Sequence, residues 1–183
     1  MPDDQELVTS RLRLRRFTAD DVEHLVSLDA DPDVMRYVTG GVTTSRREIE
    51  DEVLPAFLGY QERGSMYGFW AAEDVGTGEF FGWFHLRPAV GAPPDVPELG
   101  YRLKRTAWGR GLATEGSQAL INFAFEIGGA TRVVAETMAV NIASRRVMEK
   151  AGMRLVRSFH QDWPFPMEGA EFGDVEYAID RPP

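Results

Sequence analysis

The segment between a predicted strand and a predicted helix reads Trp108-Gly109-Arg110-Gly111-Leu112-Ala113-Thr114-Glu115. Glycine lets backbone amides crowd together, and the first turn of a helix leaves its amides without partners inside the helix. No Ser, Thr, Asp or Asn stands directly before Leu112 as a cap, so these amides are available to an anionic ligand such as a phosphate. A glycine turn with a purely structural role is the alternative interpretation.

The charge around this segment also favours a small anionic ligand. Residues 100–157 carry ten Lys or Arg against four Asp or Glu, although the whole chain has a net charge of −9. The overall charge argues against a sequence-independent nucleic-acid binder, whereas the local excess indicates a local anion or chance variation in composition. The flanking positive residues are Arg102, Lys104, Arg105 and Arg110. A dinucleotide or Walker-type site is excluded, because position 114 is Thr and no Gly-Lys-Ser/Thr is present.

Apolar patterning predicts one mixed α/β (α+β) domain. Period-two or continuous apolar runs predict strands at residues 7–17, 67–73, 79–86, 98–104, 132–137, 153–159 and 175–179. Helical spacing and caps predict helices from Thr18, from Ser45 to about Arg63 with a kink at Pro55, and over residues 112–127 and 141–151. Early antiparallel strands followed by a strand–helix alternation are typical of this class.

Composition excludes several kinds of site. The chain has no Cys, so disulfides, thiolate metal sites and a cysteine nucleophile are excluded, and its three His are widely separated. We therefore predict no metal site. The first ten residues are acidic and lack the apolar centre of a signal peptide, and no apolar run is long enough to span a bilayer. These features predict a cytoplasmic protein with no membrane partner.

Three motifs resemble the GNAT superfamily of N-acetyltransferases. Residues 108–115 resemble its acetyl-CoA pyrophosphate loop, with Gly111 and Ala113 at the two small positions of Arg/Gln-x-x-Gly-x-Gly/Ala. Trp108 replaces the Arg/Gln, as in the RimJ/RimL-like branch. The segments 141–153 and 9–15 also resemble that branch. The resemblance implies a single GNAT acyl-CoA N-acyltransferase fold over residues 7–181, with a mixed, mostly antiparallel twisted sheet flanked by helices and a short tail at residues 1–6.

The same resemblance implies that acetyl-CoA is the cosubstrate. The amides of Gly109–Thr114 would bind the pyrophosphate, and the main chain of Tyr101–Leu103 would pair with the pantetheine arm like an added strand. The implied binding residues are Tyr101, Arg102, Leu103, Trp108, Gly109, Arg110, Gly111, Leu112, Ala113, Thr114, Asn141 and Ser144. Asn141 is also an ordinary helix N-cap, and the two roles are compatible.

The resemblance places catalysis at Glu98 and Ser144. Glu98 is the candidate general base at the start of its strand, with an ordinary solvated glutamate as the alternative. Many family members carry a tyrosine acid where this chain has Met148, so Ser144 becomes the candidate that protonates or orients the departing thiolate. Tyr101, Tyr177 or solvent are the other proton sources.

We expect transfer of acetyl to a primary amine, either a protein N-terminus or a small molecule, by direct transfer in a ternary complex. The acidic segment 162–174 either attracts a cationic amine or is a solvated loop. A GNAT-fold module that binds acyl-CoA without turnover is the alternative function. The resemblance makes a homodimer possible, and it does not specify the acceptor.

Overall fold

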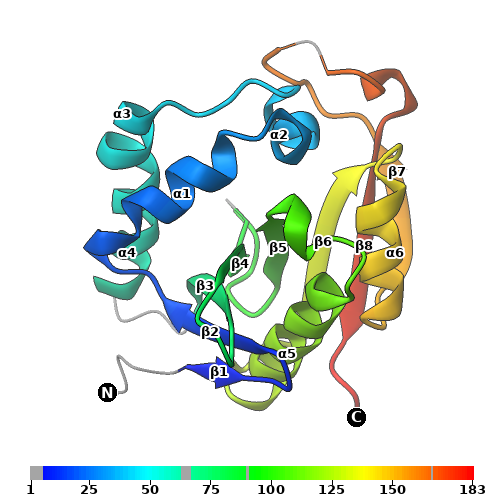
Figure 1. Ribbon diagram of the computed structural model, residues 1–183. Helices are drawn as coiled ribbons and strands as arrows, with labels where there is room; N and C mark the ends of the chain where they lie inside the picture. Colours follow the sequence, from blue (N-terminus) through cyan, green and yellow to red (C-terminus); the bar gives the residue numbers. More distant parts are fainter. Residues whose placement is uncertain (1–5, 63–66, 90, 166) are drawn as a thin grey trace.

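Eight strands form one sheet in the order β1-β2-β3-β4-β5-β6-β8-β7 (Figure 1). The computed structural model describes residues 6–62, 67–89, 91–165 and 167–183, so the predicted tail 1–6 lies outside the described residues except for Glu6. The strands are β1 (Leu7–Val8), β2 (Leu12–Arg16), β3 (Gly68–Asp74), β4 (Phe80–Pro88), β5 (Pro97–Leu103), β6 (Arg132–Met138), β7 (Arg154–Phe159) and β8 (Asp174–Asp180). Neighbouring strands are antiparallel except β5 and β6, which confirms the predicted mixed, mostly antiparallel sheet.

Helices cover the two faces of the sheet over different strands. α1 (Val22–Asp29), α2 (Pro32–Thr39), α3 (Arg46–Glu48) and α4 (Leu54–Glu62) lie together (Figure 1), and the buried apolar residues of α1, α2 and α4 pack on β3 and β4. α5 (Leu112–Glu126) and α6 (Ile142–Lys150) pack on the opposite face, against a larger core. Because both faces of β3 and β4 are covered, these strands are buried at nearly every position. Within the described residues, no helix combines the length and apolarity that a membrane crossing requires.

Two predicted elements differ from the structure. The single strand expected over residues 7–17 is wrong, because a turn at Thr9–Ser10 folds the segment into the β1–β2 hairpin, in which Leu7 pairs with Leu14. The helix expected from Ser45 does begin there, since the Ser45 hydroxyl accepts a hydrogen bond from the Glu48 amide at 3.2 Å. Ahead of Pro55 it widens into a π-helical turn, Ile49–Val53, before α4 begins. The wider turn accommodates a residue that has no amide hydrogen to donate.

The parallel contact between β5 and β6 is short. Within the described chain, the register pairs only Glu98 of β5 with Val134 of β6. Beyond that pair the two strands separate, so residues 100–103 present one backbone edge to no neighbouring strand. An exposed strand edge of this kind can accept an extended ligand as an added strand.

Candidate active site

The glycine turn between β5 and α5 holds backbone amides in a concave arrangement. Gly109 has φ of 70° and Gly111 has φ of 78°, the left-handed conformation that glycine adopts without strain. Among the described residues no side chain caps α5, and the first bond of the helix runs from the Glu115 amide to the Gly111 carbonyl at 3.0 Å. The amides of residues 112–114 therefore lack intrahelical partners and carry the positive end of the helix dipole.

The half-exposed Trp108 ring fixes the start of this turn. Its Nε1 donates a hydrogen bond to the Leu103 carbonyl at 2.8 Å. The indole therefore links the turn to the last residue of β5. This hydrogen bond occupies the Leu103 carbonyl, which the sequence analysis assigned to pantetheine binding. The backbone groups of Tyr101 and Arg102 are therefore the more accessible part of the strand edge.

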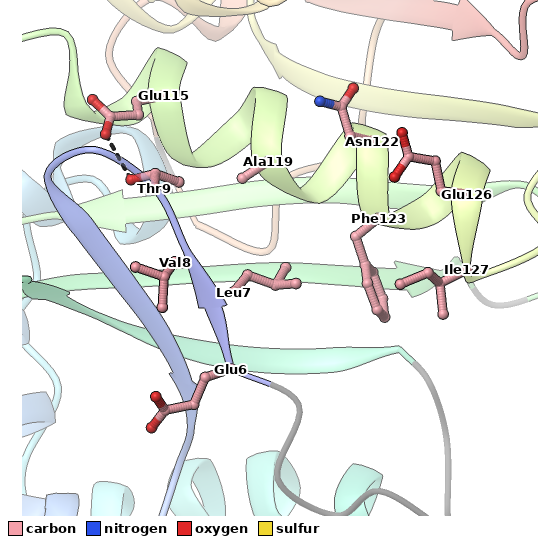
Figure 2. Close-up of a pocket in the computed structure, with 10 residues that line it drawn as sticks. All are labelled: Glu6, Leu7, Val8, Thr9, Glu115, Ala119, Asn122, Phe123, Glu126 and Ile127. Carbon is pink, nitrogen blue, oxygen red and sulfur yellow. Dashed lines mark hydrogen bonds between the residues drawn. The ribbon is translucent and has the colours of Figure 1, made fainter.

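A polar clamp ties the β1–β2 turn to the first turn of α5. The Glu115 carboxylate accepts hydrogen bonds from Thr9 Oγ1 at 2.6 Å, Ser10 Oγ at 3.0 Å and the Arg11 amide at 2.9 Å. The Arg11 guanidinium pairs with the same carboxylate at 2.6 Å and donates to the Arg110 carbonyl at 2.8 Å. Figure 2 shows Thr9 and Glu115 joined across the groove between β1 and α5. The clamp thus holds the glycine turn from the side of the N-terminal hairpin.

The positive charges near the turn are partly used within the protein. Arg102 Nη1 lies 2.7 Å from both carboxylate oxygens of the buried Asp29, so its side chain points toward α1 and away from the turn. Arg105 pairs with Asp33. The flanking positive charge is therefore partly neutralised within the protein at these two residues, and the backbone role predicted for Arg102 is unaffected. Arg110 keeps a guanidinium with no carboxylate partner among the described residues, 4.9 Å from the centre of the Phe81 ring.

Glu98 lies where β5 and β6 meet. It is opposite Val134 on β6 and opposite Arg87 on β4, and its side chain is only partly exposed. Burial raises the pKa of Glu98, and the positive charge of Arg87 offsets part of that rise. A carboxylate with a raised pKa is better matched to proton transfer near neutral pH than a fully solvated one. The site thus gives Glu98 the environment that a general base needs.

Tyr101 and Ser144 meet across the opening between β5 and α6. The Tyr101 hydroxyl lies 2.9 Å from Ser144 Oγ and 3.1 Å from the Ser144 carbonyl oxygen. Burial raises the pKa of Tyr101 to about 12, and the hydrogen bond with Ser144 opposes that rise. Asn141 caps α6, because its Oδ1 accepts the Ser144 amide at 3.2 Å. The cap fixes Ser144 in the first turn of α6, beside the edge of β5.

Tyr177, the third predicted proton source, is held elsewhere. It is buried in the core, where its hydroxyl donates to Glu149 Oε1 at 2.9 Å and accepts from Arg145 Nε at 3.2 Å. Arg145 also donates a hydrogen bond to the Ala139 carbonyl at 3.0 Å, so this charged side chain of α6 supports the core. Both partners of the Tyr177 hydroxyl belong to α6, which makes its role structural.

Comparison with known families agrees with this geometry. The family described as "Acetyltransferase (GNAT) domain" matches residues 11–154. The chain belongs to the GNAT acetyltransferase family. As a member, it is an acetyl-CoA-dependent N-acetyltransferase, and the resemblance drawn from its three motifs is confirmed.

Relatives of this GNAT acetyltransferase include proteins named as acetyl-CoA-dependent transferases. An Aspergillus fumigatus protein named FsC-acetyl coenzyme A-N(2)-transacetylase is 35% identical over 182 residues, which cover 96% of this chain and 76% of the relative. The solved structure of RimL, a ribosomal L7/L12 α-N-protein acetyltransferase in complex with coenzyme A, shares the fold with a TM-score of 0.80 and 20% identity, over 97% of this chain and 98% of RimL. An acetyltransferase from Bacillus anthracis has a TM-score of 0.76 at 24% identity, over 96% and 98% of the two chains. These two structures show the shared GNAT fold, and the RimJ/RimL-like branch stays a prediction from the motifs.

Two features of the site were not found from the sequence. The side-chain contact of Tyr101 with Ser144 joins β5 to α6, whereas the sequence assigned Tyr101 mainly a backbone role. The clamp of Arg11 on Glu115 joins residues from the opening motif and the glycine-turn motif. Arg11 and Glu115 both belong to motifs that the sequence analysis identified. Their contact with each other, however, follows only from the three-dimensional fold.

Proposed function

We propose that residues 7–181 form one domain that transfers acetyl from acetyl-CoA to a primary amine within a ternary complex. The observation that carries this proposal is the free edge of β5, which has Glu98 at one end and the uncapped amides of α5 at the other. A molecule with an extended arm and a diphosphate fits this arrangement. The edge would pair with the arm, and the amides would hold the diphosphate.

The residues present fit acetyl-CoA in this position. The proposed contacts are the amides of Gly109–Thr114 with the diphosphate, supported by Arg110, and the backbone of Tyr101 and Arg102 with the pantetheine. Trp108 and Leu103 would shape the junction between these two parts, and Asn141 and Ser144 would border the arm from α6. Acetyl-CoA supplies the activated acyl group, and no metal enters the proposal.

Glu98 would remove the proton from the attacking amine. As the nitrogen bonds to the thioester carbon it becomes acidic, and a carboxylate with a raised pKa accepts its proton directly or through a water molecule. A backbone amide near Leu99 would stabilise the oxyanion. The carbon–sulfur bond then breaks, giving the acetylated amine and the thiolate of CoA.

Relative acidities decide what Tyr101 and Ser144 do for that thiolate. A free thiol has a pKa of about 8.5, whereas burial raises the pKa of Tyr101 to about 12. A complete proton transfer from Tyr101 to the thiolate would therefore be uphill by roughly 5 kcal/mol. The pair is better suited to stabilise the thiolate by a hydrogen bond from Ser144, whose hydroxyl the tyrosine orients. Solvent or the proton taken from the amine then completes the thiol.

Two classes of amine acceptor fit the proposal. The Aspergillus fumigatus relative is named for a nitrogen designated N(2), and RimL for the α-amine of a ribosomal protein. Both a small-molecule amine and a protein N-terminus stay within the proposal.

Calorimetry followed by thiol release tests this function. Purified protein is titrated with acetyl-CoA, with NADH and ATP as controls, and we expect micromolar binding of acetyl-CoA alone. Release of the CoA thiol is then measured against a panel of primary amines. Binding without release for every amine would favour a non-catalytic acyl-CoA-binding module, and absence of binding would refute the assignment of the glycine turn.

A further inference from the structure

Carboxylates gather on the open face of the second half of the sheet. Strand alternation directs Val133 and Ala135 of β6, and Val175 and Tyr177 of β8, into the core beneath α5 and α6. The residues between them lie on the other face. There Glu136 of β6 stands directly opposite Glu176 of β8, and Glu98 of β5 continues the row across the junction at Val134. We call Glu98, Glu136 and Glu176 the acidic row.

The negative charge of this row is incompletely compensated. Arg157 of β7 lies 2.7 Å from Glu176 and 3.7 Å from Glu136, and no other cation is paired with the row among the described residues. Burial raises the pKa of Glu136, and the negative charges of Glu98 and Glu176 raise it further. Glu136 and Glu176 thus share one guanidinium, and Arg87 only offsets part of the burial of Glu98 without an ion pair to it, which is an arrangement that a further cation would stabilise.

Asp174 independently indicates a missing donor at the same place. It begins β8 two residues before Glu176, on the same face, and it is only 2% exposed. Its Oδ2 accepts the Gln161 amide at 3.1 Å, whereas its buried Oδ1 has no hydrogen-bond partner among the described residues. The negative charge of Asp174 also raises the pKa of Glu136. Because buried polar atoms in proteins nearly always have partners, this oxygen indicates a donor missing from the chain beside Glu136 and Glu176, which a ligand or an ordered water molecule supplies.

We propose that the preferred acceptor carries a second cationic group, which Glu136 and Glu176 bind beside the negative charge of Asp174, while the reacting amine lies at Glu98. This inference rests on the proposed function. Adjacent strands lie about 4.8 Å apart and residues two positions apart about 6.8 Å, which places the backbones of Glu98 and Glu136 about 8 Å from each other. A linker of roughly three to five methylene groups holds two nitrogens about 5–7.5 Å apart, a spacing that the flexible glutamate side chains on these backbones can meet. A small diamine and the amino terminus of a peptide with a nearby lysine share this chemistry.

The structure also offers one competing possibility that the test includes. Arg87, opposite Glu98 on β4, has no carboxylate partner within hydrogen-bonding distance among the described residues and could bind an acceptor carboxylate. We favour the cation because the carboxylates at the junction outnumber the cations and because Asp174 lacks a donor. A preference for anionic acceptors would show that Arg87 governs recognition instead.

Three acceptors of equal length separate these outcomes. Butane-1,4-diamine, 4-aminobutan-1-ol and 4-aminobutanoate share a primary amine at one end and differ in the charge at the far end, and kcat/KM for the diamine is halved because its two amines are equivalent. With saturating acetyl-CoA at fixed pH, we expect kcat/KM to be at least about 10-fold higher for the diamine than for the amino alcohol, and lowest for the amino acid. The tripeptides Ala-Lys-Ala and Ala-Gln-Ala, compared in the same way, distinguish a peptide from a small diamine as the source. Equal kcat/KM values, or a preference for 4-aminobutanoate, would overturn the inference.

The variant Glu136→Gln tests the row itself, with Glu79→Gln in the exposed β3–β4 turn as its matched control. We expect Glu136→Gln to lower kcat/KM for the diamine about 5- to 10-fold and to leave the amino alcohol unchanged, whereas Glu79→Gln changes neither. Calorimetric titration with butane-1,4-diamine in the presence of CoA measures binding apart from turnover. Diamine binding that weakens in Glu136→Gln without any acetyl transfer would support the inference and refute the proposed activity. If Glu136→Gln turns over all three acceptors as the native protein does, the inference is refuted and the proposed acetyl transfer stands.

Discussion

Replacing Glu115 with alanine removes the clamp on the glycine turn and leaves a good helix former in the first turn of α5. The change deletes three hydrogen bonds, from Thr9, Ser10 and the Arg11 amide, together with the ion pair to the Arg11 guanidinium. The Arg11 side chain is 47% exposed, so it can rehydrate, and each hydrogen bond counts about 0.5 kcal/mol and the ion pair about 0.5–1 kcal/mol. The expected loss in free energy of unfolding is therefore about 2–2.5 kcal/mol.

Thermal and denaturant unfolding measure this loss. For a chain of this size, about 2–2.5 kcal/mol corresponds to a fall in Tm of roughly 4–10 °C. The control is Glu126→Ala near the end of the same helix, where the glutamate is exposed and forms no described hydrogen bond or ion pair; its Tm should change by less than about 2 °C. Because the clamp also holds Arg110, Glu115→Ala should raise the KM for acetyl-CoA several-fold. Equal stability and equal KM in the two variants would refute the reasoning.

The pH dependence of the same variant checks the ion pair separately. Burial alone would raise the pKa of Glu115, but hydrogen bonds from Thr9 and Arg11 outweigh it and lower the pKa below its usual value. A carboxyl whose pKa is lower in the folded state stabilises the protein above its unfolded pKa of about 4.3. That contribution disappears as the pH falls through the lowered folded pKa. The stability difference between the native protein and Glu115→Ala should therefore be constant from pH 7 to about pH 5 and shrink in stronger acid.

Three further predictions concern the site directly. Gly111→Val should abolish acetyl-CoA binding in calorimetry, whereas Gly78→Val, which has a similar φ of 75° in the β3–β4 turn, should suffer comparable backbone strain and still bind; equal binding by both would remove the glycine turn from the site. Glu98→Gln should lower kcat about 10²-fold with acetyl-CoA affinity retained. Its pH–rate profile should lose the fall in activity that the native enzyme shows as the pH drops through the raised pKa of Glu98, and an unchanged profile would exclude it as the base. Ser144→Ala should lower kcat about 10-fold, and Tyr101→Phe less, because the tyrosine acts through the serine; a larger loss in Tyr101→Phe would reverse these roles.

The parts of the site that local sequence determines were predictable. Gly111 and the absence of a cap before Leu112 predict a turn with unpaired backbone amides from a few neighbouring residues. Asn141 likewise predicts the start of α6. The contacts between residues far apart in the sequence could not be predicted. The clamp joins Arg11 to Glu115, and the β5–β6 junction joins Glu98 to Val134, so each depends on how the strands assemble.

Errors in the predicted elements have the same physical origin. An alternating pattern over residues 7–17 cannot reveal that Thr9 and Ser10 turn the chain, because the turn is stabilised by Glu115, which is distant in sequence. Apolar periodicity likewise predicts a helix through Pro55 without specifying how the backbone accommodates the missing amide hydrogen.

The opening between β5 and β6 has a mechanical consequence for the whole molecule. It divides the sheet into a half with β1–β5 and a half with β6, β8 and β7, joined by one short parallel contact and by the packing of α5 across both. Acetyl-CoA bound at the edge of β5 would bridge these two halves and stabilise their packing. A ligand present at 100 times its dissociation constant stabilises a folded protein by about 2.7 kcal/mol. Amide hydrogen exchange in β5 and β6 would therefore slow as acetyl-CoA accumulates, and the rigidity of this enzyme would follow the acetyl-CoA supply of its surroundings.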